Sequence, residues 1–181
     1  MKIVLLDFFN LIKRYTYRVE TEFSDLTDGE VISNLTAYIL NKIDSVLNEV
    51  KPQMVYICSD CGFNTRAASV VEGYKANRNR QKSLTDEEKE KSYIEFLKRV
   101  MATLPFPYLE VNNTEADMLI GFIINYLTVL DKDSRFVIVS SDSDFLQFLS
   151  PNTSIYDWNK GLVTADNWTE KYDKHGIDIS I

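Results

Sequence analysis

Short apolar runs rich in β-branched residues recur along the chain, and each run predicts a buried β-strand. Segments with the three-to-four-residue spacing of amphipathic helices separate these runs. Such alternation is typical of an α/β fold with a mostly parallel sheet. The four predicted strands are residues 2–6, 54–57, 108–111 and 136–139.

Three of the intervening segments predict long helices, each with a different burial pattern. The first, about 28–50, carries an apolar stripe that predicts one buried face. The second begins near 84 and ends before Pro105, and its first half is too charged to be buried. The third begins at Thr114 and is nearly apolar throughout, which predicts a helix sandwiched against the sheet. Shorter elements are predicted after the fourth strand: a helix at 143–149, a strand at 155–158, a turn at 159–161 and a helix at 167–174.

Composition favours one globular domain spanning residues 1–181. The chain has 181 residues, of which 45% are hydrophobic, enough for a sizeable core. No run reaches the roughly 18 apolar residues of a membrane span, and Met1 leads into a strand without a cleavable leader. We therefore expect a cytoplasmic monomer that does not contact membranes.

The cysteines and the single histidine suggest little chemistry. Cys58 and Cys61 form a C-x-x-C pair, which is typical of half a zinc site or a redox dithiol. A structural zinc needs four ligands, and His175 is the only histidine of the chain. Two reduced thiols, buried or half-buried, are the favoured interpretation, and His175 is expected at the surface.

Acidic residues follow the predicted strands at the points where those strands end. Because ligands of open α/β sheets bind at the carboxyl ends of the strands, these carboxylates are expected to converge. They are Asp7 after the first strand, Asp60 after the second, Glu115 and Asp117 after the third, and Asp142 and Asp144 after the fourth.

Two interpretations of these acids compete. Taken singly, several could cap helices: Thr114 and Asp117 fit a capping box, and Asp142 fits an N-cap. Asp7 is different, because it lies inside an apolar run where an unpaired carboxylate is costly. A hard divalent cation would neutralise the group, and all-oxygen ligation favours Mg²⁺ or Mn²⁺. Two such ions about 4 Å apart suit phosphodiester hydrolysis.

Charge and motifs narrow the alternatives. The net charge is −7, yet residues 66–82 hold five basic side chains and one acid, so this stretch is either a phosphate contact or a solvated loop. Neither a P-loop nor a G-x-G-x-x-G turn is present. Phe9 stands where an aspartyl phosphatase usually has its second aspartate, and a receiver-type acidic pocket would leave Asp60 unexplained.

Four motifs, in order, resemble those of the flap endonuclease and 5′–3′ exonuclease family. This family includes the 5′-nuclease domain of bacterial DNA polymerase I and phage ribonuclease H, and the phage enzymes are the most similar in character. The resemblance covers essentially the whole chain. The motifs are Leu-Leu-Asp7-Phe-Phe-Asn10, Tyr74-Lys75-Ala76-Asn77-Arg78, Glu115-Ala116-Asp117 and the run from Ser140 to Gln147 through Asp142 and Asp144.

The resemblance implies a PIN-like, three-layer nuclease core with two Mg²⁺ ions, for which Mn²⁺ would substitute. Its substrates would be DNA with a 5′ flap or end and RNA–DNA hybrids, as in RNA primer removal during replication. If phage-encoded, it would act in the host cytoplasm. Residues 74–92 would form a helical arch or clamp over the single strand.

Roles for individual residues follow from the same resemblance. The first ion would be held by Asp7, Asp60, Glu115, Asp117 and Asp142, and the second by Asp142 and Asp144. Lys75 and Arg78 would hold the scissile phosphate and act with Asp142 in catalysis. Tyr74 would stack on a base near the cut, and Arg80 and Lys82 would add substrate contacts.

Two departures from the family pattern modify this expectation. The family usually reads Glu-Ala-Asp-Asp, and Met118 replaces the last acid. The chain also ends before the helix-hairpin-helix module. Either the sequence is part of a longer protein, or a minimal form of the enzyme recruits duplex contacts from a replication protein. In both cases we expect this chain to hold the second ion weakly, to bind duplex weakly and to cut slowly. The rival hypotheses are a catalytically weakened PIN-like module that binds nucleic acid or protein, and a phosphatase of small molecules.

Overall fold

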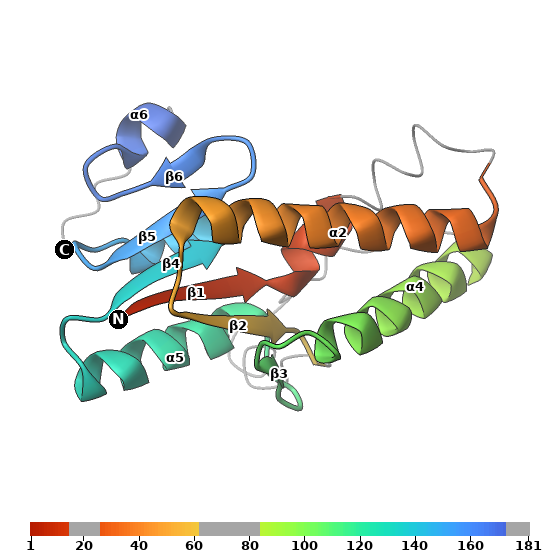
Figure 1. The fold of residues 1–181 in the computed structure, drawn as a ribbon, viewed down its shortest axis with the longest axis horizontal. Coiled ribbons are helices and arrows are strands. Elements are labelled where there is room, and N and C mark those ends of the chain that lie inside the picture. The colour runs from red at the N-terminus through yellow and green to blue at the C-terminus, as the bar shows by residue number, and fades with distance from the viewer. Residues whose placement is uncertain (15–25, 62–83, 173–181) are drawn as a thin grey trace, which may run out of the picture.

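A six-stranded sheet forms the centre of the computed structural model, which describes residues 1–14, 26–61 and 84–172, the side chains of 84–87 excepted (Figure 1). The strand order is β3-β2-β1-β4-β5-β6. The pairs from β3 to β5 are parallel and β6 runs antiparallel to β5, so the predicted mostly parallel sheet is confirmed. The strands are β1 (Lys2–Asp7), β2 (Met54–Ser59), β3 (Tyr108–Glu110), β4 (Arg135–Val139), β5 (Thr153–Asp157) and β6 (Gly161–Val163).

Helices cover both faces of the sheet and give the three layers that the sequence predicts. The helices are α2 (Asp28–Val50), α4 (Leu84–Ala102), α5 (Ala116–Leu130), α6 (Trp168–Tyr172) and the 3₁₀ helix η2 (Ser143–Phe148). One core joins α2 and α4 to Val4 and Leu6 of β1. The other joins α5, η2 and α6 to Ile3 and Leu5, the alternate residues of the same strand. The alternation follows from the two-residue period of a strand.

Helix α2 shows why the local sequence folds as predicted. Thr27 and Glu30 form a capping box at its first turn. The Thr27 side chain accepts the Glu30 N–H, and the Glu30 side chain accepts the Thr27 N–H. The expected apolar stripe is buried, with Leu35 and Ile39 fully inaccessible. Lys51 adopts a left-handed conformation with φ of 50° and donates its N–H to the Leu47 carbonyl, which ends the helix.

Several elements differ from the sequence-based predictions. Residues 8–14 are helical directly after β1, where only an apolar run was recognised. Strand β6 begins at Gly161, the last residue of the predicted turn, and was not predicted, because its three residues are too few for a periodic pattern. Helix α5 is not sandwiched: it begins at Ala116, and one side is open to solvent, with Phe122 65% exposed and Val129 80% exposed. Within the described ranges, no helix combines the length and the apolar character needed to cross a bilayer.

Candidate metal-binding site

The strand order places three predicted site residues side by side. Strand β1 lies between β2 and β4 and is parallel to both, so the carboxyl ends of all three strands share one edge. Asp7 is the last residue of β1, Asp60 follows β2, and Asp142 lies three residues after β4. Asp7 is therefore the middle acid of the edge, with Asp60 on one side and Asp142 on the other.

Asp7 is the most constrained of these acids. Its carboxylate accepts the Asn10 N–H at 3.1 Å and the Ser140 hydroxyl at 2.9 Å. Only 8% of the residue is exposed. Burial raises the pKa of Asp7 to about 6, and the Asp60 and Asp142 carboxylates add to that rise while the two hydrogen bonds oppose it. No cation of the described part of the chain forms an ion pair with Asp7.

Ser140 and Asn10 tie the end of β1 to the end of β4, and sequence reasoning assigned neither a role. The Ser140 hydroxyl donates to Asp7 and accepts the Asp142 N–H at 3.1 Å, so one buried oxygen links two candidate ligands. The Asn10 side-chain carbonyl accepts the Ser141 N–H at 3.0 Å. The sequence signal that could have identified Ser140 is the pair of serines between the apolar fourth strand and Asp142.

Asp60 connects β2 to the start of α5. Its carboxylate accepts the Ala116 N–H at 2.7 Å, which satisfies one free donor of the first helical turn. The predicted capping box of Thr114 and Asp117 is wrong, because Glu115 is the N-cap and the Thr114 hydroxyl donates to the Asn112 carbonyl. Glu115 is accordingly brought to the strand edge by a contact from Asp60.

The remaining predicted ligands differ in exposure. Glu115 is buried, with 8% exposed, whereas Asp142 and Asp144 are exposed and Asp117 is intermediate. The Asp117 carboxylate accepts the Met118 N–H at 2.6 Å. Asp142 caps η2 by accepting the Asp144 N–H at 3.0 Å, which confirms the capping interpretation of Asp142. A cap leaves the second carboxylate oxygen for another ligand.

The chemistry of the donor atoms fits a hard divalent ion, although the described acidic side chains do not surround a common centre. Across the described residues, no three acids, thiols or imidazoles come close enough to hold one ion. The donors at the edge are carboxylate oxygens, which suit Mg²⁺ or Mn²⁺, and these ions keep several waters among their ligands. The pKa of Asp7 is raised mainly by burial and further by the Asp60 and Asp142 carboxylates, and a bound cation would oppose both effects by stabilising the ionised form. The residues therefore fit a water-rich metal site.

The two cysteines are separate from this chemistry. Cys58 is buried and Cys61 is half-buried, and both are free, which confirms the interpretation as reduced thiols. Burial and the neighbouring Asp7 carboxylate raise the pKa of Cys58 to about 12. A hydrogen bond to Glu110 raises the pKa of Cys61. Neither sulfur is thus disposed to become a thiolate nucleophile or ligand.

The predicted substrate-binding residues lie outside the described residues, as does His175. These are Tyr74, Lys75, Arg78, Arg80 and Lys82. Two described cations lie near the acidic edge, and one of them, the Arg14 guanidinium, donates to the hydroxyl of Ser141 beside Asp142. The Lys98 ammonium pairs with Glu110 at 3.0 Å and donates to the Asp60 carbonyl at 3.4 Å. Of the predicted arch at 74–92, residues 84–92 form the first half of α4.

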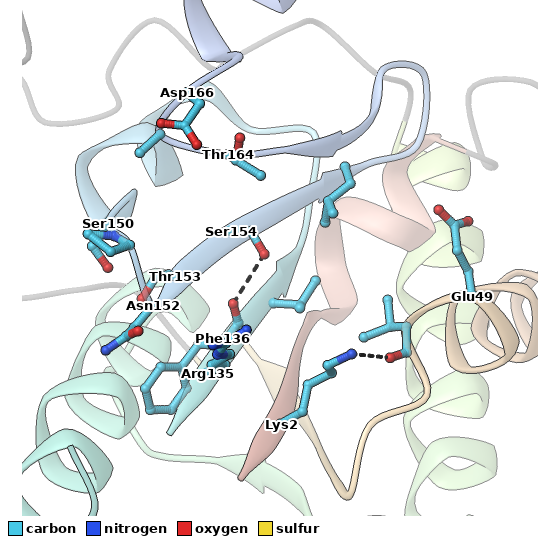
Figure 2. Close-up of a pocket in the computed structure, with 15 residues that line it drawn as sticks. Lys2, Glu49, Arg135, Phe136, Ser150, Asn152, Thr153, Ser154, Thr164 and Asp166 are labelled. Carbon is cyan, nitrogen blue, oxygen red and sulfur yellow. Dashed lines mark hydrogen bonds between the residues drawn. The ribbon is translucent and has the colours of Figure 1, made fainter. Parts of the chain in front are cut away.

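A cavity of about 570 Å³ lies at the opposite edge of the sheet. Figure 2 shows that Lys2, Arg135 and Thr153, from the starts of three strands, line it. The Lys2 ammonium donates to the Val50 carbonyl at 2.9 Å, and the Ser154 hydroxyl donates to the Phe136 carbonyl at 3.3 Å. None of the six predicted acids lines this cavity. It is therefore separate from the acidic edge.

Fold and edge together define an α/β protein whose acidic side chains collect where parallel strands end, the place where such folds bind phosphate ligands. The chain belongs to the 5′–3′ exonuclease family. The family's model, described as "5'-3' exonuclease, N-terminal resolvase-like domain", matches residues 2–174. The resemblance inferred from the sequence is thereby confirmed.

Relatives of known name agree with this family. DNA polymerase I of Lactococcus lactis subsp. cremoris is 27% identical over 140 residues, covering 76% of this chain and 15% of the polymerase. The flap endonuclease Xni of Vibrio atlanticus is 30% identical over 158 residues, covering 86% of this chain and 56% of that protein.

Solved structures show the same fold. A metal-ion co-crystal of a bacteriophage T5 protein has a TM-score of 0.76 at 16% identity, covering 96% of this chain and 61% of that one. The T5 flap endonuclease in a complex with DNA and metal ions has a TM-score of 0.69 at 14% identity, with the same coverage. This chain spans less than two thirds of each of these proteins.

Proposed function

We propose that this protein is a divalent-metal-dependent 5′-nuclease that hydrolyses phosphodiester bonds in 5′-flap or 5′-ended DNA and in RNA–DNA hybrids. The observation that carries the proposal is the buried carboxylate of Asp7 between two further acids at the edge of a parallel sheet. Such a cluster is stabilised by a multiply charged cation and suits a phosphate-bearing substrate.

The metal would be held at the carboxyl edge by Asp7, Asp60, Glu115, Asp117 and Asp142, with Asp144 toward a second and weaker ion. A bound Mg²⁺ or Mn²⁺ supplies charge compensation and a bound water of lowered pKa. The chain's own contribution is positioning. Ser140 orients Asp7 against Asp142, and Asp60 holds the helix start that carries Glu115.

Substrate contacts belong to the basic segment. Lys75 and Arg78 would hold the scissile phosphate, Tyr74 would stack on a base, and Arg80 and Lys82 would contact the backbone. Support comes from the named relatives, since the Vibrio protein is a flap endonuclease and the phage T5 flap endonuclease forms a complex with DNA and metal ions. Primer removal would be the corresponding role in replication.

Cleavage of a labelled 5′ flap and of a labelled RNA–DNA hybrid, with Mg²⁺, Mn²⁺ or a chelator, tests the proposal. We expect cleavage that the chelator abolishes. Asp142→Asn should lose more than the roughly 10 to 100-fold that changes around a metal site's outer shell cost. Asp133→Asn is the matched control, because Asp133 is an exposed acid near the other end of the same strand. Equal cleavage by wild type and Asp142→Asn would overturn the proposal.

A non-cleaving nucleic-acid-binding module is the second candidate. It is favoured by the open geometry of the acids, since no three of them in the described ranges are grouped to hold one ion. Fluorescence anisotropy with the same flap separates the two functions. Metal-independent binding, equal in wild type and Asp142→Asn and without cleavage in any metal, would favour this candidate.

A further inference from the structure

Helix α5 exposes a continuous apolar stripe to solvent. We call it the α5 stripe; its members are Met118 (47% exposed), Phe122 (65%), Tyr126 (55%), Val129 (80%) and Leu130 (65%). The spacings of four, four, three and one residues place them on one side of a helix. The opposite side packs on the sheet through Ile120, Ile123 and Ile124.

The α5 stripe is too large and too uniform to be scattered surface residues. No charged residue occurs from Met118 to Leu130. With about 200 Å² for a whole aromatic side chain and somewhat less for the others, the exposed fractions correspond to roughly 550 Å². A patch of this size stands at the upper end of what soluble monomers expose, and patches of that size are often functional.

The order of side chains along the α5 stripe is symmetric. Position 124 is midway between Phe122 and Tyr126, and it is also midway between Met118 and Leu130. In an antiparallel pair of α5 helices related by a two-fold axis at this position, each aromatic ring meets the other aromatic position of the second copy. Met118 likewise meets Leu130. Such self-complementarity is what a two-fold interface requires.

We propose that two copies of this chain associate through the α5 stripe, with the two helices packed antiparallel, in place of the monomer expected from the sequence. If both stripes are fully covered, the two copies together bury about 1,100 Å² of surface, which is near the lower limit for specific protein interfaces. The dimer is therefore a concentration-dependent one. Phe122 and Tyr126 already contact each other, with stacked rings whose centroids are 6.0 Å apart and whose interplanar angle is 10°, so each ring limits the freedom of the other before association.

Antiparallel packing is compatible with the rest of the molecule. The dipoles of the two helices oppose each other, which is the favourable arrangement. Helix α5 begins beside Asp60 at the carboxyl edge and spans 15 residues, about 22 Å. The two acidic edges consequently lie at opposite ends of the helix pair. Each acidic edge then lies beside the C-terminal end of the α5 helix of the second copy.

Sedimentation velocity of the wild-type chain over a 100-fold range of concentration tests the proposal. We expect the sedimentation coefficient to rise from the monomer value to the dimer value. Phe122→Glu with Tyr126→Glu places like charges opposite each other and should weaken dimerisation at least tenfold. Phe122→Glu with Tyr126→Lys places opposite charges across an antiparallel pair, and like charges across a parallel one, so this variant should dimerise more strongly than the doubly glutamate-substituted one.

Leu162→Glu is the control, because Leu162 is a 41% exposed apolar residue of β6 outside the α5 stripe. Its dimerisation should equal that of the wild type, and thermal melts should show that every variant is folded. A wild-type chain that stays monomeric throughout overturns the proposal, including one that instead binds lipid vesicles. A dimer that persists in the doubly glutamate-substituted variant also overturns it. Neither readout depends on nuclease activity.

Discussion

Replacing Asp7 by asparagine should stabilise the metal-free protein at neutral and alkaline pH. The pKa of Asp7 is raised from 3.8 to about 6 in the folded chain, mainly by burial. Between about pH 4 and pH 6 the folded state keeps a proton that the unfolded state has lost. Stability therefore falls as the pH rises through this window and then stays low. Asparagine does not ionise, so the variant does not lose this stability as the pH rises.

The size of the effect follows from the same values. At about 1.4 kcal/mol for each tenfold change in ionisation constant, the difference between 3.8 and about 6 corresponds to about 3 kcal/mol. The asparagine side chain of the Asp7→Asn variant would keep one of two contacts: its amide oxygen still accepts the Asn10 N–H, but its NH₂ group cannot accept from Ser140. Losing the hydrogen bond from Ser140 reduces the expected stabilisation by about 1 kcal/mol. The net gain is about 2 kcal/mol, or roughly 4 to 8 °C in Tm for a chain of this length.

Urea and thermal denaturation with a chelator at pH 8, 6 and 4 measure this gain. We expect the full gain at pH 8, most of it at pH 6, and its loss below about pH 4, where Asp7 is protonated in both states. Adding Mn²⁺ at pH 8 should stabilise the wild type and narrow the difference, because the ion binds the folded state through Asp7. A gain independent of pH, or a destabilised variant at pH 8, would show that repulsion and burial do not govern this carboxylate.

Three further substitutions test hydrogen bonds at Asp7 and at the buried Asp157. Ser140→Ala removes the buried hydroxyl that links Asp7 to Asp142, so stability should fall by about 1 to 3 kcal/mol in urea denaturation and Mn²⁺ affinity should fall in calorimetry; unchanged stability would contradict the link. Asp157→Ala removes a buried carboxylate that accepts the Tyr172 hydroxyl at 3.2 Å and two backbone N–H groups, with an expected cost of about 2 to 4 kcal/mol, whereas Tyr172→Phe should cost about 1 kcal/mol. If Asp157→Ala and Tyr172→Phe cost the same stability, the two backbone hydrogen bonds to Asp157 do not contribute.

Local patterns were sufficient for the elements that repeat a period over many residues. The stripe of α2, from Leu35 to Val50, needed only the helical spacing, and the β-branched runs needed only their neighbours in sequence. The acids at the strand ends could be predicted for a related reason. In a parallel sheet every strand runs the same way, so residues that follow the strands must share an edge whatever the strand order.

Where a pattern was short or apolar on all sides, sequence alone failed. The helical residues 8–14 follow a strand without a break in hydrophobicity, and β6 has three residues. The third helix was predicted to be sandwiched against the sheet, and the prediction was wrong because hydrophobicity does not show what is available to cover the outer side of a helix. Whether Phe122 is buried depends on the number of layers packed over the helix, and that number is a property of the whole fold.

By itself, the sequence determined the α/β class, the family and the set of acids at one sheet edge, because strand periodicity and motif order are local. Only the tertiary structure decided that Asp7 is the middle acid, since its neighbours Asp60 and Asp142 come from strands far apart along the chain. The same holds for the hydrogen bond from Ser140 to Asp7, whose partners are separated by 133 positions. Contacts of this kind depend on strand order, and strand order is set by how both helical layers pack against the sheet.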